Sequence, residues 1–252
     1  MTEKIAIFVP VYFREDTVRL CVQGLLETCK SPGYDVRIIF VDNKSNDTLR
    51  QYLKETAEQN ECVETILLDS NIGKAKAVMT AVEKFNDFDW FVNCDSDIVP
   101  LEAGWPGLLV DCFKGIPGAG MVATFYTHNG NNPQPPQPKT FHVKVGETDY
   151  SFHWGGGVAG GCFVTSRKIW DETEYDVTGA VYGGVDGRFR KTVADNGWKC
   201  GWIEQIVVEH INDKDEYKGY CAWKAEVQHR ILKKGALADP KELGNDKGFW
   251  DK

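Results

Sequence analysis

Two aspartates separated by one serine follow a short apolar segment, in the stretch FVNCDSDIVP at residues 91–100. In an extended strand, residues i and i+2 point to the same side about 7 Å apart, so Asp95 and Asp97 are expected to face one object together. A divalent cation such as Mn²⁺ or Mg²⁺ would offset their repulsion and keep positions open for phosphate oxygens. The triplet therefore predicts a Lewis-acid metal site for a diphosphate, although D-x-D also occurs as an ordinary turn.

Two of the remaining candidates suit a nucleotide. Asp42 ends an expected strand and can accept a hydrogen bond from a base N–H, although it can also be a simple turn residue. Lys74 follows Asn71 and Gly73 and can meet a phosphate or the base. A solvated surface lysine is the competing interpretation.

Two later residues suit chemistry. His210 follows an apolar segment in VVEHIND, where a neutral imidazole can ligate a metal or have a structural role. Asp186 lies in YGGVDGRFRK at the expected start of a helix. Its carboxylate can take a proton from an attacking hydroxyl, or it can simply stabilise the helix N-terminus.

Alternating strands and helices must position these residues. Apolar runs and helical spacing predict strands at 5–12, 36–41, 63–68 and 90–94, with helices over 18–29, 49–53 and 75–85. Asp16 is expected to cap the first helix, and Asn46 or Asp47 the second. Repeated βαβ units indicate an α/β protein with a Rossmann-like, mostly parallel central sheet and helices on both faces. Ligands bind at the carboxyl ends of such strands, where the polar candidates lie.

The second half is less regular. A strand is expected over 119–125, a possible hairpin arm over 143–154, a helix after Gly184 and a strand over 202–208. Residues 128–141 are rich in proline, asparagine and glutamine and predict a loop, and the whole 128–153 segment is either a lid over the acceptor or a connector. A last helix is expected over 217–233. We treat residues 1–252 as one domain, with a nucleotide-binding half (4–100), an acceptor and catalytic half (101–211) and a helical tail (212–252).

Composition narrows the class of protein. The chain has 252 residues, 42% of them hydrophobic, and a formal net charge of -8, which does not favour a nucleic-acid binder. None of the eight cysteines forms a C-x-x-C pair, so we expect buried, reduced thiols in a cytoplasmic protein rather than a zinc site. No run approaches the roughly 20 apolar residues that cross a bilayer. The first turn, PVYFRED, has no glycine, which argues against a nicotinamide dinucleotide site.

Seven segments in order resemble the GT-A fold glycosyltransferases, in particular the inverting enzymes of family 2. They are IFVPVYFRED, VDNKSND, SNIGKAKAV, CDSDIVP, AGGCFVTSRKIWDE, GGVDGRFRKTVADNGWKC and VVEH. The resemblance covers residues 4–211. It implies transfer of a sugar from a nucleotide-sugar, with UDP as the expected nucleotide.

The resemblance also implies roles for single residues. The nucleotide would be contacted by Pro10, Val11, Asp42, Asn71, Lys74 and Asp95. The metal, Mn²⁺ or Mg²⁺, would be held by Asp97 with Asp95 and His210. Gly160 and Gly161 would lie beside the sugar and acceptor, and Asp186 would be the catalytic base.

The chain departs from the family pattern at two points. Val185 precedes Asp186 where an acidic pair is usual, and the Q-x-x-R-W motif of polymerising members is absent, so transfer of one sugar is expected. A glycan hydroxyl is the first acceptor expected. A hydroxymethylated base in DNA is the second, because aromatic residues interleave with basic ones over 214–234, although such a segment is more often a solvated face. Alternatives to the transferase are a sugar-phosphate nucleotidyltransferase and a non-catalytic nucleotide-sugar binding module.

Overall fold

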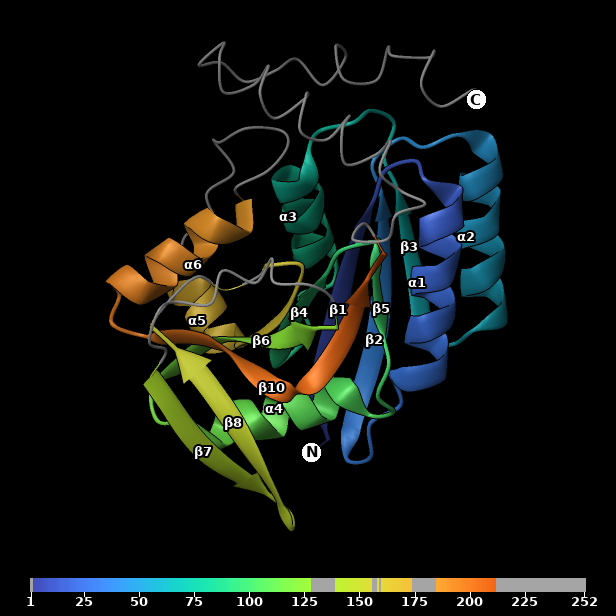
Figure 1. Ribbon diagram of the computed structural model, residues 1–252. Coiled ribbons are helices and arrows are strands. Elements are labelled where there is room, and N and C mark those ends of the chain that lie inside the picture. Colours follow the sequence, from blue (N-terminus) through green and yellow to red (C-terminus); the bar gives the residue numbers. More distant parts are fainter. Residues whose placement is uncertain (1, 128–138, 156–157, 159, 174–184, 212–252) are drawn as a thin grey trace.

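The computed structural model describes residues 2–127, 139–155, 158, 160–173 and 185–211 (Figure 1). Its first half contains the parallel strands β1 (Glu3–Val11), β2 (Tyr34–Asp42), β3 (Val63–Leu67) and β4 (Trp90–Cys94). They lie in the order β3-β2-β1-β4. The helices α1 (Glu15–Thr28), α2 (Asp47–Gln59) and α3 (Lys74–Lys84) connect them. The predicted alternation of strand and helix is confirmed.

Burial on both faces explains why these strands are apolar runs. Ile7, Phe8 and Val9 at the centre of β1 are fully buried, because helices cover both faces of this part of the sheet. Figure 1 shows α1 and α2 on one side and α3 on the other. The chain reverses its direction across the sheet between β3 and β4, since β4 pairs with β1 on the side away from β2. The carboxyl ends of β1 and β4 therefore form a switch point, where open α/β sheets bind ligands.

The second half extends the same sheet with both parallel and antiparallel strands. It contains β5 (Ile98–Pro100), β6 (Ala119–Tyr126), β7 (Lys139–Val145), β8 (Thr148–Trp154), β9 (Cys162–Ser166) and β10 (Lys199–His210). The helices are α4 (Trp105–Gly115), α5 (Arg167–Glu172) and α6 (Val185–Asp195). Beyond β4 the order is β9-β6-β10-β8-β7, and β5 pairs with β10. Because β9 is antiparallel to β4 and β6, the sheet is mixed outside its first four strands.

Several local expectations can now be compared with the structure. Asn46 caps α2 and accepts a hydrogen bond from the Leu49 N–H at 2.9 Å, as predicted. Asp16 is not the cap of α1: the N-cap is Arg14, in the left-handed region without a side-chain cap bond, and Asp16 lies in the first turn. The hairpin arm expected over 143–154 is confirmed, because β7 and β8 pair from Lys139 to Trp154. The loop expected over 128–141 is wrong for 139–141, which begins β7.

Other expectations fall outside the described residues, namely those for 128–138 and for the tail over 212–252 with its helix at 217–233. The division of the chain into halves stays a prediction. Among the described cysteines, none is in a disulfide and all but Cys62 are buried, which agrees with the expected reduced thiols. Within the described ranges, no helix combines the length and apolar character that crossing a membrane requires.

Candidate active site

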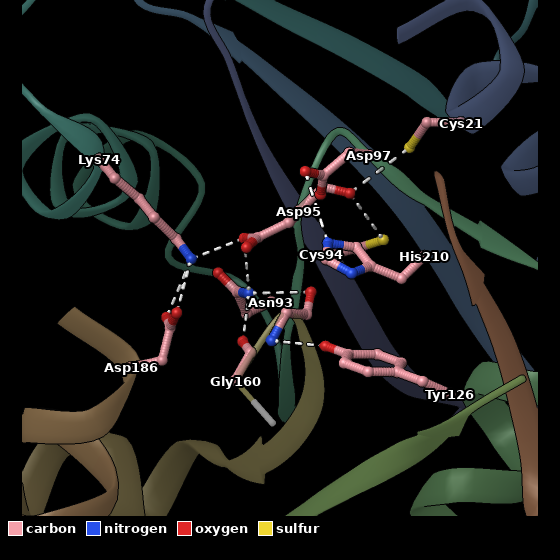
Figure 2. Close-up of polar contacts among 11 residues, drawn as sticks. Cys21, Lys74, Asn93, Cys94, Asp95, Asp97, Tyr126, Gly160, Asp186 and His210 are labelled. Carbon is pink, nitrogen blue, oxygen red and sulfur yellow. Dashed lines mark hydrogen bonds and ion pairs between the residues drawn. The ribbon is translucent and has the colours of Figure 1, made fainter. Parts of the chain in front are cut away.

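The two aspartates of the D-S-D triplet lie in a turn rather than in an extended strand. The strand β4 ends at Cys94, and the Ile98 N–H donates to the Asp95 carbonyl at 3.0 Å, which closes a β-turn over the triplet. The expectation that both carboxylates face one object was therefore based on the wrong backbone geometry. Figure 2 shows the Asp95 side chain directed towards Lys74 and the Asp97 side chain towards His210.

Lys74 joins Asp95 to Asp186. Its ammonium, at the first residue of α3, donates to Asp95 Oδ1 at 2.6 Å and to the two Asp186 carboxylate oxygens at 3.0 and 2.9 Å (Figure 2). The three side chains are 20–31% exposed, so the contacts are only partly screened by water. Lys74 is thus paired with two carboxylates and is not a solvated surface lysine, and its contact with a nucleotide stays a prediction.

Aromatic packing holds the helix that carries Asp186. Phe189, one turn further along α6, is 1% exposed and stacks on Phe163 of β9 with ring centroids 5.6 Å apart. Trp170 lies beside Phe189 and stacks on Phe91 of β4 at 4.1 Å. Since residues i and i+3 share a helix face, burial of Phe189 turns Asp186 towards the same edge of the sheet.

Gly160 allows Asp186 to approach. A Cβ atom at Gly160 would lie 2.1 Å from Asp186 Cβ and 2.8 Å from its Cγ, so a larger residue cannot fit without displacing the aspartate. The predicted proximity of this glycine to the reaction centre thus has a structural counterpart in its packing against the candidate base.

The electrostatics of Asp186 suit a proton acceptor. Burial raises the pKa of its carboxyl above the ordinary value, Lys74 lowers it, and the negative charge of Asp95 raises it again. The net direction is upward. A carboxylate with a raised pKa is a stronger base near neutral pH than an exposed aspartate.

Asp97 and His210 form a second pair. His210 Nε2 lies 3.6 Å from Asp97 Oδ2, and their side chains are 22% and 12% exposed. The backbone brings them together, because His210 pairs with Ile98 between β10 and β5 and the Ile211 N–H donates to the Asp97 carbonyl at 2.9 Å. A carboxylate oxygen and an imidazole nitrogen are both ligands for Mn²⁺, and 3.6 Å is too long for a hydrogen bond between them.

This pair fits a divalent cation in its donor chemistry. Asp97 and His210 would be the residues that hold such an ion, and the ion would supply Lewis-acid chemistry beside them. Within the described residues, no group of three or more His, Cys, Asp or Glu side chains forms a preassembled metal cluster. The predicted third ligand, Asp95, bonds to Lys74 instead.

A buried polar network connects the two halves of the site. Asn93, inside β4, is 0% exposed and its amide donates to Asp95 Oδ1 at 3.3 Å and to the Gly160 carbonyl at 3.1 Å. The Asp95 N–H donates to the Gly161 carbonyl at 2.7 Å, and the Gly161 N–H donates to the Tyr126 hydroxyl at 3.0 Å. The polar asparagine within the apolar run WFVNC was a sequence signal for this network.

The ends of β1 and β2 carry residues that are predicted to contact the nucleotide, and we call this part of the sheet the nucleotide edge. The Asp42 carboxylate is fully buried, accepts the Ser45 N–H at 3.1 and 3.3 Å, and lies 3.5 Å from Arg50 Nε. Burial raises the pKa of Asp42. The contact of Asp42 with a base stays a prediction, but its position beside the switch point agrees with it.

The predicted residues Pro10, Val11 and Asn71 are at this edge too. The Asn43 N–H donates to the Val11 carbonyl at 2.8 Å, its side chain accepts the Ile72 N–H at 2.8 Å, and Asn71 accepts the Gly73 N–H at 3.0 Å. These bonds join the turns after β1, β2 and β3, and Pro10 precedes Val11 at the end of β1.

Backbone strain marks the same edge. Phe13, Arg14 and Lys44 have φ values of 52°, 58° and 71°, in the left-handed region that residues other than glycine rarely adopt. Such strain persists where the surrounding structure imposes it and gathers at functional sites. The turn after β1 therefore reaches, without glycine, a conformation that the sequence did not predict.

Comparison with known proteins decides the family. The family described as "Glycosyl transferase family 2" matches residues 6–174, which is more than half of the chain. The chain belongs to glycosyl transferase family 2. It is therefore a glycosyltransferase, as the resemblance implied.

Two curated relatives of this glycosyltransferase are bacterial. It is 30% identical over 97 residues to the undecaprenyl-phosphate 4-deoxy-4-formamido-L-arabinose transferase of Photorhabdus laumondii, covering 38% of this chain and 30% of the relative. It is 28% identical over 119 residues to the enzyme of the same name from Pseudomonas fluorescens, covering 47% and 35%. The matched region thus spans about a third of these relatives.

Solved structures agree on the fold. GalNAc-T7 with UDP, GalNAc and Mn²⁺ has a TM-score of 0.69 at 15% identity, covering 86% of this chain and 45% of its own. The mannosyltransferase PcManGT from Pyrobaculum calidifontis, in complex with GDP-Man and Mn²⁺, has a TM-score of 0.64 at 15% identity and covers 94% and 66%. S. aureus TarS 1-349 has a TM-score of 0.62 at 11% identity, with 88% and 65%. The glycosyltransferase has the GT-A fold.

Proposed function

We propose that this glycosyltransferase moves one sugar from a nucleotide-sugar, with UDP as the expected nucleotide, to an acceptor hydroxyl with inversion at the anomeric carbon. The observation that carries the proposal is the contact of Lys74 with both Asp95 and Asp186. This contact supports the proposal because it joins the Lys74 ammonium, which can bind a diphosphate, to the Asp186 carboxylate, whose pKa is raised. Both lie at the switch point of the sheet.

The reaction balances as a direct displacement. The acceptor oxygen forms a bond to the anomeric carbon, the bond from that carbon to the diphosphate oxygen breaks, and the acceptor proton passes to Asp186. The nucleoside diphosphate leaves with the bonding pair. Asp186 accepts a proton only when its carboxylate is released from Lys74, and phosphate oxygens of an entering donor would compete for that ammonium. Lys74 would then face the leaving group.

The ion proposed for this site is Mn²⁺ or Mg²⁺, and it would stabilise the charge on the departing diphosphate. Asp97 and His210 would hold it, with Asp95 as the predicted third ligand. The donor chemistry and the 3.6 Å spacing of the first two support this assignment. Two structural neighbours were determined with Mn²⁺, which supports a divalent ion in the same fold.

A panel of nucleotide-sugars with Mn²⁺ or Mg²⁺ tests the proposal, with released nucleotide and thermal stabilisation as readouts. Asp186→Asn should abolish transfer to a hydroxyl and leave donor binding within about two-fold of wild type, since only the proton acceptor is lost. Asp195→Asn is the matched control, because Asp195 lies on the same helix in an exposed pair with Lys191. Wild-type transfer by Asp186→Asn would remove this aspartate from the role of base.

The acceptor is tested with the same variant. A glycan hydroxyl is the proposed class, and a hydroxymethylated base in DNA is the second. The names of the two bacterial relatives add a polyprenyl phosphate. A phosphate acceptor is already ionised at neutral pH and needs no base, so Asp186→Asn should retain transfer to a phosphate and lose transfer to a hydroxyl.

The family match, which shows a glycosyltransferase, leaves the sugar-phosphate nucleotidyltransferase and the non-catalytic binding module without support.

A further inference from the structure

Tyr126 is a site residue to which neither the sequence motifs nor the comparisons assign a role. It is the last residue of β6 and pairs with Val208 of β10. Because β6 and β10 run parallel, Tyr126 and His210 reach the same edge of the sheet. Figure 2 shows the Tyr126 side chain beneath His210, on the side of the site where Gly160 lies.

Two contacts place the tyrosine between the halves of the site. Its hydroxyl accepts the Gly161 N–H at 3.0 Å, and the Gly161 carbonyl in turn accepts the Asp95 N–H at 2.7 Å. Its ring stacks on the His210 imidazole, with centroids 5.3 Å apart and an angle of 20° between the planes. One side chain thus connects to Asp95 through a peptide and to Asp97 through the histidine.

The fit around the hydroxyl is close. A Cβ atom at Gly161 would lie 2.4 Å from the Tyr126 hydroxyl, so this position needs glycine as long as the tyrosine is present.

We propose that Tyr126 is a positioning residue that fixes the Gly160–Gly161 turn through its hydroxyl and the His210 ring through stacking. We call the hydrogen bond from the Gly161 N–H to the Tyr126 hydroxyl the hydroxyl arm, and the ring contact with His210 the stacking arm. The hydroxyl arm keeps Gly160 against Asp186, and the stacking arm keeps the imidazole turned towards Asp97. The inference rests on the proposed function, because it assigns both arms to a metal-assisted transfer site. Residues that orient a metal ligand typically contribute about 10- to 100-fold to metal affinity or activity.

Two substitutions separate the arms. Tyr126→Phe keeps the ring and removes the hydroxyl, whereas Tyr126→Leu removes both. Tyr150→Phe is the matched control, since Tyr150 is a buried tyrosine on β8. The measurements are Mn²⁺ binding in the presence of UDP or GDP, from the electron paramagnetic resonance signal of free Mn²⁺, and kcat and KM for the best donor. A melting temperature for each variant identifies unfolded protein.

The two arms predict different results. Tyr126→Phe should bind Mn²⁺ within about two-fold of the control while kcat falls about ten-fold with little change in donor KM. Tyr126→Leu should lose both, with Mn²⁺ affinity about ten-fold weaker. If Tyr126→Phe keeps the metal binding that Tyr126→Leu loses, and yet has reduced turnover, a general loss of stability does not explain the two results.

Equal Mn²⁺ affinity in Tyr126→Leu and Tyr150→Phe overturns the stacking arm. Equal kcat in Tyr126→Phe and Tyr150→Phe overturns the hydroxyl arm. The proposed function fails in a different way, since wild-type protein would then take up neither Mn²⁺ nor any nucleotide-sugar.

Discussion

Replacing Gly160 with alanine would place a methyl group against the candidate base. The new Cβ would lie 2.1 Å from Asp186 Cβ, whereas ordinary van der Waals contact begins at 3.4 Å, so Asp186 would have to move by about 1.3 Å. Misplacing a catalytic group by about 1 Å can cost roughly 100-fold in rate. We therefore expect kcat to fall about 100-fold, which corresponds to about 2.7 kcal/mol of activation free energy.

Steady-state kinetics with the best donor and isothermal calorimetry of donor binding measure the two consequences. Donor affinity should change little, because the displaced group is the proton acceptor and not part of the nucleotide edge. The overpacking should also lower the free energy of unfolding by about 1–3 kcal/mol, so a melting curve must show that the variant is folded at the assay temperature.

Gly187→Ala is the matched control, because it makes the same glycine-to-alanine change at a site where the new methyl group touches nothing. Gly187 is the residue after Asp186 in α6, and a Cβ atom there would meet nothing within 4 Å. Alanine at this helical position should keep full activity and raise stability by up to about 1 kcal/mol. A folded Gly160→Ala enzyme that transfers sugar at the wild-type rate would refute the placement of Asp186 as the base.

Three further outcomes are expected. Burial raises the pKa of Asp186, and Lys74 lowers it. Because the base works only when it is deprotonated, kcat/KM should fall as the pH drops through that raised pKa. Lys74→Met removes the lowering effect and should therefore move this acid limb of the profile to higher pH. A pH profile in which Lys74→Met shifts the limb downward, or not at all, contradicts this electrostatic role. Phe189→Ala should lower the free energy of unfolding by about 3–5 kcal/mol in denaturant titrations and reduce kcat, because it removes the buried ring that packs α6 against Phe163. Stability within about 1 kcal/mol of wild type would argue against this packing role. Asn46→Ala should cost about 1 kcal/mol of stability without changing donor binding, because it removes the cap bond to Leu49; an unchanged melting temperature would show that the cap contributes nothing measurable.

Much of the first half was predictable because its signals are local. The apolar runs of β1, β2 and β4 and the helical spacing of α1 and α3 are each contained within a few residues, so the element order follows from hydrophobic periodicity alone. The same holds for Asn46, whose capping bond spans three residues. The predicted start of α6 at Asp186 also rested on a local signal.

The errors arose where local geometry had alternatives. The D-S-D triplet continued an apolar strand, but the backbone turns at Asp95 and separates the two carboxylates. Asp16 suited a cap by residue type, yet Arg14 takes that position in a left-handed conformation. The hairpin arm expected over 143–154 was found, but the start of β7 at Lys139 was taken for loop because its exposed residues carry little hydrophobic pattern.

The amino-acid sequence by itself determined that this is an α/β chain with acidic residues after its strands, and that its motifs follow the order of the family 2 glycosyltransferases. Only the tertiary structure decided that Lys74 bridges Asp95 and Asp186, and that Tyr126 stacks on His210. The reason is physical. Periodicity reports which face of an element is buried, whereas the partners across the sheet depend on the strand order β1-β4-β9-β6-β10, which long-range pairing sets and no local pattern encodes.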